Sequence, residues 1–331
     1  MPNLGAHFRG VVVVGLENLT RIAMSTKGKA DPIKLDHADR QTIHNAMNEY
    51  IENRFVQIAV IDFLRSLTPT AAAEELAPFV APALEALETH NLSIEFVTTC
   101  CHLLASMSGH PELVALIAEA GGVKILMEVW HLNPDNPAAV GGVINAVCGQ
   151  MTVDASVAEV IALGGHRDAI AALAQFGELP GVLGGLCSVL WALAMDDVVL
   201  ELFVENKLVL DLLKLAEAYP QDTELLVQLS LALTTLFVDQ RCAVQANGAA
   251  VVSNPIQPMI ACLDTHRARS DVVGPIVGML NEMCRHFVLV ELLLPCDVVE
   301  ILTRLKQEHR YRPQLANLCQ ETLHTITTAS A

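Results

Sequence analysis

The chain has 331 residues, of which 52% are hydrophobic and only 4% aromatic, and its formal net charge is −17. Because alanine, leucine and valine supply most of the apolar content, the composition favours closely packed helices over a β-sandwich or barrel. The excess of acidic residues disfavours nucleic acid and anionic membranes as partners, because binding either of them requires a basic face.

The mean hydropathy of +0.42 requires a check for membrane-spanning segments. No stretch supplies the roughly 20 consecutive apolar residues that a spanning helix needs. The uncharged stretch 179–195 is short and runs into Asp196, and the N-terminal valines make a poor signal peptide. Nine cysteines without paired spacing indicate buried, reduced thiols. We therefore expect a cytoplasmic protein, with a cytoskeletal or ciliary setting as a narrower expectation, that is neither secreted nor inserted in a membrane.

The first part of the chain predicts a helix over 8–25 and a loop over 27–32, where Gly, Pro and exposed charges cluster. Asp36 or Asp39 is expected to cap the next helix, and a further helix over 56–67 ends before Pro69. Together these elements make a first, somewhat irregular repeat.

The rest of the chain alternates short and long amphipathic segments separated by Gly, Pro or Asn. Asn91 and Asp271 are expected to act as helix caps. The predicted helices cover 79–87, 94–107, 112–120, 123–130, 138–151, 157–163, 169–175, 180–195, 198–205, 208–218, 225–238, 259–263, 272–284, 298–306 and 313–326.

A turn signal recurs along the chain at a step in the low forties. Gly121-Gly122 separates two helical segments, and Gly164-Gly165 does the same about 43 positions later. Glu205-Asn206-Lys207 is a third copy, and Asn247-Gly248 opens a fourth. Glycine suits such a turn because it adopts a positive φ without steric cost. A helical unit repeated at this period predicts a helical solenoid.

Each unit reads as a short helix, a glycine turn, a medium helix, a loop and a long helix. This order resembles the armadillo repeat, with the HEAT repeat, which lacks a distinct first helix, as the alternative. The resemblance implies an all-α, right-handed superhelix of about six three-helix repeats, with residues 1–35 as a helix and loop that cap the array. The approximate units are 36–76, 77–120, 121–163, 164–205, 206–247 and 248–331.

In armadillo arrays the long third helices line a concave groove, and importin-α clamps peptides there with a Trp and, four residues on, an Asn in each repeat. Aligning the long helices of this chain gives only Trp191 at such a position and no Asn. A receptor for basic localisation peptides is therefore disfavoured. The groove of β-catenin is lined by Lys and Arg, whereas the third helices here carry chiefly Arg65 and Arg285.

Two surfaces are predicted to bind other proteins. Trp191 with Met195 suits an anchor for a partner helix, although Trp191 packed in the core is an equal alternative. The basic C-terminal part suits an acidic partner, with ordinary solvated surface as the alternative. The predicted groove residues are His102, Ser106, Asn145, Trp191, Met195, Thr235 and Glu282, and the predicted basic patch is Arg267, Arg269, Arg285, Arg304 and Arg310.

No catalytic motif is present: the chain lacks a phosphate-binding Gly loop ending in Lys-Ser/Thr, a His-Glu-x-x-His and a Gly-x-Ser-x-Gly. Glycine pairs at 141–142 and 184–185 are interpreted as close helix approaches. We expect no enzyme activity, cofactor or metal, and leave the oligomeric state open. The predicted role is a protein-interaction scaffold or structural component of a larger cytoplasmic or cytoskeletal assembly. The alternative is a chaperone-type adaptor, or an exchange factor, that grips a client in the groove.

Overall fold

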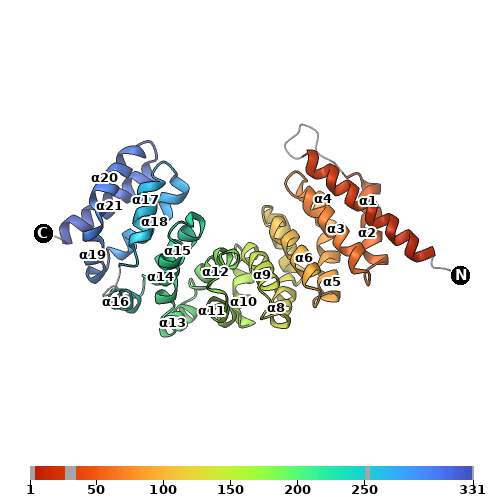
Figure 1. Ribbon diagram of the computed structural model, residues 1–331, viewed down its shortest axis with the longest axis horizontal. Helices are drawn as coiled ribbons and strands as arrows, with labels where there is room; N and C mark the ends of the chain where they lie inside the picture. The colour runs from red at the N-terminus through yellow and green to blue at the C-terminus, as the bar shows by residue number, and fades with distance from the viewer. Residues whose placement is uncertain (1–3, 27–34, 250–253, 330–331) are drawn as a thin grey trace. The chain divides into compact units, whose positions relative to one another are not determined.

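The computed structural model describes residues 4–26, 35–249 and 254–329, and every regular element in these ranges is a helix. The chain divides into two compact units, Met1–Gly165 and His166–Ala331. Each unit is a series of short helices connected by tight turns (Figure 1). Within the described ranges, none of the helices combines the length and the apolarity that crossing a bilayer requires.

In unit 1 the chain begins with the long helix α1 and continues with helices of 4 to 14 residues. Its elements are α1 (Leu4–Thr26), α2 (His37–Glu49), α3 (Arg54–Leu67), α4 (Ala73–Leu76), η1 (Ala77–Phe79), α5 (Val80–Thr89), α6 (Ile94–Met107), α7 (Pro111–Glu119), α8 (Gly122–Leu132), α9 (Pro137–Gln150) and α10 (Asp154–Ala162).

Unit 2 continues the same order of short, medium and long helices. Its elements are α11 (Gly165–Phe176), α12 (Pro180–Leu193), α13 (Asp197–Glu205), α14 (Leu208–Ala218), α15 (Thr223–Leu236), α16 (Gln240–Ala249), α17 (Gln257–Thr265), α18 (Ser270–Met283), α19 (Phe287–Leu293), η2 (Leu294–Cys296), α20 (Val298–Glu308) and α21 (Pro313–Ala329).

The helices fall into three kinds that repeat in order. The first helices are α4, α7, α10, α13, α16 and α19, the second helices are α2, α5, α8, α11, α14, α17 and α20, and the third helices are α3, α6, α9, α12, α15, α18 and α21. The described residues thus contain seven pairs of a second and a third helix. The sequence-based estimate of about six repeats merged the last two pairs into the unit 248–331.

Third helices stack on one another at a step of one repeat. In unit 1, α3 packs on α6 and α6 on α9, and in unit 2, α12 packs on α15, α15 on α18 and α18 on α21. The stacked faces are aliphatic, and Leu64, Leu104 and Ile144 are completely buried between neighbours. Burial of apolar area of this kind is the main stabilising term, at about 25 cal/mol per Å². The predicted all-α solenoid fold is confirmed.

Four of the turns that lead into a second helix contain one left-handed residue. Gly121 and Gly164 adopt φ of 75° and 88°, as the glycine pattern predicts, and Lys207 occupies the same place with φ of 56°. Asp297 does so before α20, with φ of 53°. The fourth predicted turn is wrong: Asn247 and Gly248 lie inside α16, and residues 250–253 are outside the described part of the chain.

The second glycine of each pair is required for a different physical reason. A side chain at Gly122 would place its Cβ 2.5 Å from Ile117 Cγ2 and 2.8 Å from the Ile117 carbonyl oxygen. At Gly165 the added Cβ would lie 3.1 Å from the Val160 carbonyl oxygen and 3.2 Å from Met127 Cε. The first glycine therefore supplies the backbone angle and the second supplies the space that close helix packing needs.

Side chains at the ends of second helices tie each repeat to the one before it. The donor is in each case a His, Asn or Tyr, and the acceptor is a backbone carbonyl 39 to 42 residues earlier. These bonds join His90 Nε2 to Ile51 O (2.7 Å), Asn133 Nδ2 to Asn91 O (2.9 Å), Tyr219 OH to Gly177 O (3.3 Å) and His309 Nε2 to Arg267 O (2.7 Å). Each bond satisfies a loop carbonyl that the helix ends leave without a partner.

Several local predictions can be compared with the structure. Asp36 caps α2 and forms a capping box with Asp39, as expected. Asn91 is not the cap of α6, because Ser93 holds that place. Asp271 is likewise not a cap, because α18 begins after Arg269 and Asp271 lies in its first turn. The predicted loop 27–32 is outside the described residues, and the short helices α4, α16 and α19 were not predicted.

The glycine pairs in the third helices also differ from one another. An added Cβ at Gly142 would touch Cys101 Cβ at 3.4 Å, which supports the close approach of α9 to α6. At Gly184 it would meet nothing within 4 Å, so a close approach does not explain that glycine.

The cysteines are buried as predicted, and none forms a disulfide. Cys148, on α9, is the one that is half-buried rather than buried. Burial raises the pKa of both Cys101 and Cys187 to about 12. These thiols are therefore uncharged and act as small apolar side chains of the core.

Lys207 allows a direct test of the backbone cost at the turn. A non-glycine residue in the left-handed region costs roughly 1–2 kcal/mol, and glycine removes that cost while adding about 0.5–1 kcal/mol of chain entropy. We expect Lys207→Gly to raise the free energy of unfolding by up to about 1 kcal/mol in urea denaturation. The matched control is Lys214→Gly in the interior of α14, which should lower it by about 1 kcal/mol. A decrease for both variants would contradict the strain at Lys207.

Candidate protein-interaction surface

On six of the third helices, the accessible residues lie at fixed positions relative to the residue that follows the helix. The residues directly after these helices are Thr68, Ser108, Met151, Ala194, Phe237 and Cys284. Counting back from them, positions four and five are buried in all six helices, and positions six and three are at least partly accessible. Position two is accessible in five of the six, Glu282 being buried at 8% exposure. This i, i+3, i+4 spacing defines one helix face.

We name these residues the third-helix face of each unit. In unit 1 the face consists of Asp62, Arg65, Ser66, His102, Ala105, Ser106, Asn145, Cys148 and Gly149. In unit 2 it consists of Ser188, Trp191, Ala192, Leu231, Thr234, Thr235, Gly278, Asn281 and Glu282. Most of these side chains are small or polar, so the face carries little bulk except at Trp191.

The helix ends correct the register of two predicted groove residues. His102 and Asn145 both lie six residues before the residue that ends their helix, as the predicted alignment requires. The equivalent residue in α12 is Ser188, not Trp191, and the equivalent of Ser106 is Ala192, not Met195. The predicted pair therefore lies three residues too far along the chain, because the alignment favoured the aromatic residue.

On the unit 1 face an ion pair lies close to a histidine. Arg65 contacts Asp62 at 2.9 Å, with both side chains on α3. Burial lowers the pKa of His102 on α6, the positive charge of Arg65 lowers it further, and Asp62 opposes the shift. His102 is therefore neutral at neutral pH. The hydroxyl of Ser106 donates to the Leu103 carbonyl at 2.7 Å, and Asn145 is exposed.

On the unit 2 face large apolar side chains reach the surface. Trp191 is 39% exposed, whereas Trp130 is 4% exposed, so Trp191 is not a core residue. Met195 is 71% exposed, and the hydroxyl of Thr235 donates to its sulfur at 4.0 Å. Val238, 61% exposed, lies next to Phe237, the residue that ends α15, as Met195 lies next to Ala194, the residue that ends α12. We call Trp191, Met195 and Val238 the unit 2 anchor.

Val238 was missed by the sequence analysis. Its signal was available, since it stands 43 positions after Met195, one repeat step later. A polar bond beside the anchor holds α12 and α15 together, because Ser188 Oγ donates to Gln228 Oε1 at 2.7 Å. The backbone beneath the anchor is thereby fixed.

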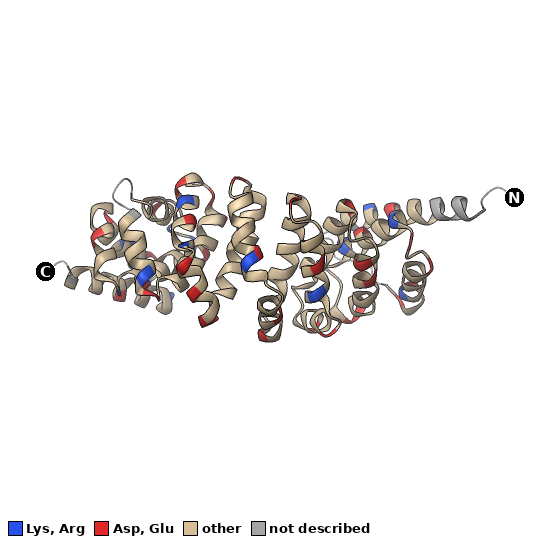
Figure 2. Cartoon of the chain, turned by 90° about the horizontal axis from the view of Figure 1, so that it is seen from below, with Lys and Arg blue, Asp and Glu red and all other residues tan. Residues whose placement is uncertain are grey.

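Most arginines of the predicted basic patch form ion pairs with carboxylates of this chain. Each of four arginines lies within 4 Å of a carboxylate, and the guanidinium of Arg310 stacks over the Tyr311 ring at 4.7 Å. The pairs are Arg267 with Glu308 (3.2 Å), Arg269 with Asp271 (2.7 Å), Arg285 with Glu282 (3.1 Å) and Arg304 with Asp264 (3.3 Å). Over the whole sequence acidic residues outnumber basic ones, 37 to 20. Figure 2 shows acidic and basic positions scattered over the helices. Binding of an acidic partner at this patch stays a prediction.

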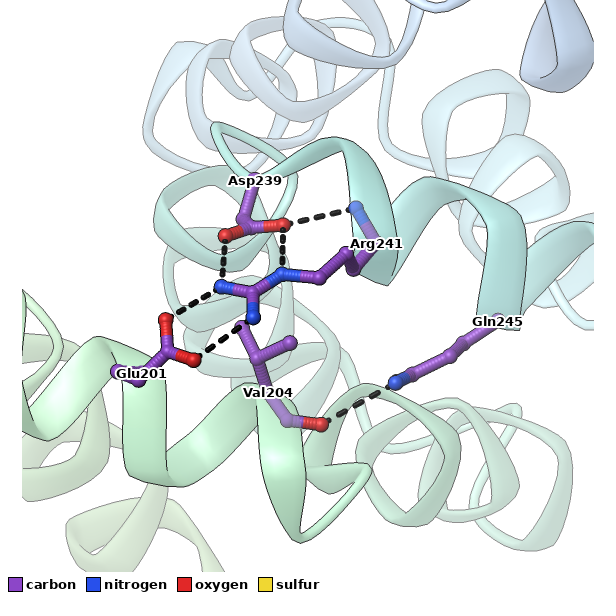
Figure 3. A network of polar contacts seen from close by, with 5 residues as sticks. All are labelled: Glu201, Val204, Asp239, Arg241 and Gln245. Carbon is purple, nitrogen blue, oxygen red and sulfur yellow. Dashed lines mark hydrogen bonds and ion pairs between the residues drawn. The ribbon is translucent and has the colours of Figure 1, made fainter.

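A polar network joins the first helices α13 and α16 in unit 2 (Figure 3). Arg241 donates to both carboxylate oxygens of Glu201, at 2.7 and 2.5 Å, and its Nε donates to Asp239 at 3.1 Å. Gln245 Nε2 donates to the Val204 carbonyl at 3.1 Å. Hydrogen bonds to Arg241 lower the pKa of both Glu201 and Asp239. The bonds join residues about 40 positions apart, so we interpret the network as a tie between repeats.

In 4–26, 35–249 and 254–329 no three His, Cys, Asp or Glu side chains come together in a way that would hold a metal ion.

Comparison with known proteins supports the fold. No protein-family model and no curated protein matches the chain. The crystal structure of an engineered protein is similar with a TM-score of 0.67 and 16% identity, over 94% of this chain and 74% of that chain. A structure from work on a phosphorylation switch that controls the interaction between cadherin and β-catenin is similar with a TM-score of 0.62 and 11% identity, over 98% of this chain and 77% of that chain. At these identities the likeness shows the solenoid fold alone.

The charges around His102 generate a pH prediction. Arg65→Ala should raise the pKa of His102 and Asp62→Asn should lower it, because one change removes a repelling charge and the other an attracting one. Histidine NMR titration of the folded protein measures both. Because the folded pKa lies below the unfolded one, His102 costs stability as the pH falls below about 6.5. Shifts of the same sign in both variants would contradict the arrangement.

The Arg241 network generates a second prediction. Arg241→Ala should lower the melting temperature, by less in 1 M salt, since exposed ion pairs are screened. Glu201 and Asp239 have depressed folded pKa values, so their contribution is present above about pH 4 and is lost as the pH falls through those values. The difference between wild type and Arg241→Ala should therefore shrink in acid, and an unchanged difference at pH 3 would contradict the network.

Proposed function

We propose that this chain is a non-catalytic, armadillo-type scaffold that binds a partner protein through the third-helix face of unit 2. The observation that carries the proposal is the unit 2 anchor, in which Trp191 on α12 is exposed together with Met195 and Val238, which lie in the turns after α12 and α15. Exposed apolar clusters surrounded by polar residues mark protein-interaction sites. Tryptophan is enriched among the residues that dominate binding energy, and methionine adapts to the shape of a partner.

The anchor suits a helical or irregular segment that inserts apolar side chains beside Trp191. The surrounding side chains of the face are small or polar, which leaves room for the backbone of a partner. The bond from Thr235 to Met195 and the bond from Ser188 to Gln228 restrain the two helices that carry the anchor. Such preorganisation lowers the entropic cost of binding.

The armadillo assignment rests on the distinct first helix and on the left-handed residue that follows it. A HEAT repeat lacks that first helix, whereas α7, α10 and α13 are each followed by such a turn, at Gly121, Gly164 and Lys207. β-catenin, whose interaction with cadherin is the subject of one similar structure, is an armadillo-repeat protein. We therefore propose protein binding by an armadillo-type array.

A fixed place in a larger cytoplasmic or cytoskeletal assembly is favoured over a reversible chaperone-type adaptor. Large apolar side chains are exposed at many points outside the third-helix faces, as contacts on several sides of the molecule require. These residues are Phe55, Leu92, Leu132, Val198, Val244, Phe287 and Tyr311, with exposed fractions of 50–81%. An adaptor that uses the groove alone has no need of them.

Affinity capture with tagged full-length protein tests the proposal. Trp191→Ala with Met195→Ala should reduce recovery of the bound partner at least tenfold, because truncating a dominant contact residue costs about 2 kcal/mol or more. The matched control is Val299→Ala, an apolar residue on the second helix α20 whose exposed fraction of 38% is close to that of Trp191 and which lies outside the surfaces named above. Equal losses for anchor and control, or no loss for the anchor, would reject the unit 2 face as the binding surface.

A second measurement separates the two functions. A fixed component should co-elute with its partner in size-exclusion chromatography and exchange slowly with added free protein. Exchange within seconds, together with loss of all binding in the anchor variant, would instead support the adaptor.

A further inference from the structure

Among the described residues of unit 1, the row of stacked second helices is one member shorter than the row that α1 forms with the third helices. In the interior of the array a second helix packs against its own third helix and against the next second helix: α2 contacts α3 and α5, and α5 contacts α6 and α8. Unit 2 repeats the arrangement, since α14 contacts α15 and α17. Each second helix thus has a defined place beside two neighbours.

Helix α1 extends the row of third helices by one member. It packs along α3 in the way that α3 packs along α6 (Figure 1). The row of second helices is not extended with it, because within residues 4–26 and 35–165 no helix lies beside α1 and α2 in the corresponding place. The layer that α1 begins therefore has a third helix but no second helix.

An apolar cleft of about 570 Å³ occupies this place. One wall comes from α1, through Val12, Gly15, Leu16 and Leu19, and these positions follow the i, i+3, i+4, i+7 spacing of one helix face. The other wall is α2 with the residue that follows it, from Asp39 to Tyr50, and Leu35 together with Val60 and Phe63 of α3 completes the lining. The α2 wall is about 16 Å long at 1.5 Å per residue, which is three helical turns.

We propose that this cleft binds an amphipathic helix of a partner protein, which takes the place of the missing second helix. The second helices of the chain that flank comparable places have 9 to 13 residues, and a helix of this length matches the α2 wall. The occupant presents an apolar stripe to Leu16 and Leu19 and follows the helix-in-groove mode of recognition.

Charge complementarity adds a second requirement for the occupant. Asp39 lies in the first turn of α2 and Glu49 in its last, so carboxylates mark both ends of the wall. Neither Lys nor Arg is among the described residues that line the cleft. Lysine or arginine residues at both ends of the bound helix therefore meet opposite charge. A second copy of this chain is disfavoured, because two molecules of net charge −17 repel each other.

A designed peptide is the probe for this site. It has 13 residues, leucines at an i, i+3, i+4, i+7 spacing, lysines at both ends and a hydrocarbon staple that holds it helical. We expect it to bind the full-length protein with a micromolar Kd in fluorescence anisotropy. A peptide of the same composition with the leucine spacing scrambled, and one with glutamates at its ends, should each bind at least tenfold more weakly.

Matched variants locate the bound peptide. Leu19→Glu should weaken binding at least tenfold, whereas Val14→Glu, on the same helix but outside the cleft, should leave it unchanged. Glu49→Lys should weaken binding of the basic peptide and strengthen that of the acidic one. Glu52→Lys, an exposed glutamate outside the cleft, should do neither.

A filling variant keeps the proposal testable if a charge in the cleft unfolds α1. An added Cβ at Gly15 meets nothing within 4 Å, so Gly15→Leu is compatible with the fold and should block the cleft, with the melting temperature unchanged or raised. Trp191→Ala should not alter peptide binding, which separates this site from the unit 2 anchor.

The contrary outcomes are distinct. Equal binding of the scrambled peptide, equal effects of Leu19→Glu and Val14→Glu, or full binding to Gly15→Leu would each overturn the proposal. A dimer in sedimentation equilibrium that Leu19→Glu abolishes would overturn it in favour of a second copy of the chain. Peptide binding that depends on Trp191 would also overturn it, by assigning the peptide to unit 2.

Discussion

The contact between one third helix and the next is the constraint on which the rest of the molecule depends. Within each unit it repeats at one step, and it buries the positions four and five residues before each helix end. These positions are filled by residues such as Leu104 and Leu190, which are fully or nearly fully buried. Because one helix face is used for stacking and another packs against the second helix, only the i, i+3, i+4 stripe is left for solvent or for a partner. The stacking of third helices thus determines which positions are accessible to a partner, whatever residue occupies them.

The repeat step also organises the polar contacts, and this explains why the loops hold their positions. Asn133 and His309 donate to carbonyls 42 residues earlier, and Arg241 reaches Glu201 40 residues earlier. Buried backbone groups need hydrogen-bond partners at every turn, and a repeated backbone geometry allows the same type of bond to form in successive repeats. In the four bonds to loop carbonyls the donor varies from histidine to asparagine to tyrosine but stands at the end of a second helix each time, whereas Arg241 lies on the first helix α16. The loops are therefore specified by position rather than by residue type.

The solenoid and most helices were predictable from the period of the glycine turns and the 3.6-residue apolar pattern. The turn at Lys207 was found only because its neighbours matched, since lysine carries no signal for a positive φ. The fourth turn was misplaced at Gly248 because glycine is equally compatible with the interior of α16. Trp191 was placed three residues out of register because three residues of a helix turn through about 300°, and the apolar pattern alone separates such positions poorly. The cleft at α1 could not be predicted from the sequence, because it depends on which helices are neighbours in space.

Helix α1 is the first described member of the row of stacked helices. A solenoid needs a terminal element whose outer face is polar, because the last stacking surface otherwise remains exposed. Helix α1 covers the stacking surface of α3, yet Val14, Leu19 and Met24 on α1 are themselves 43–56% exposed. An apolar surface therefore remains exposed on α1, although α1 covers the stacking surface of α3. The same stacking that builds the array makes its first described layer incomplete, and a helix of complementary pattern is the element that completes it.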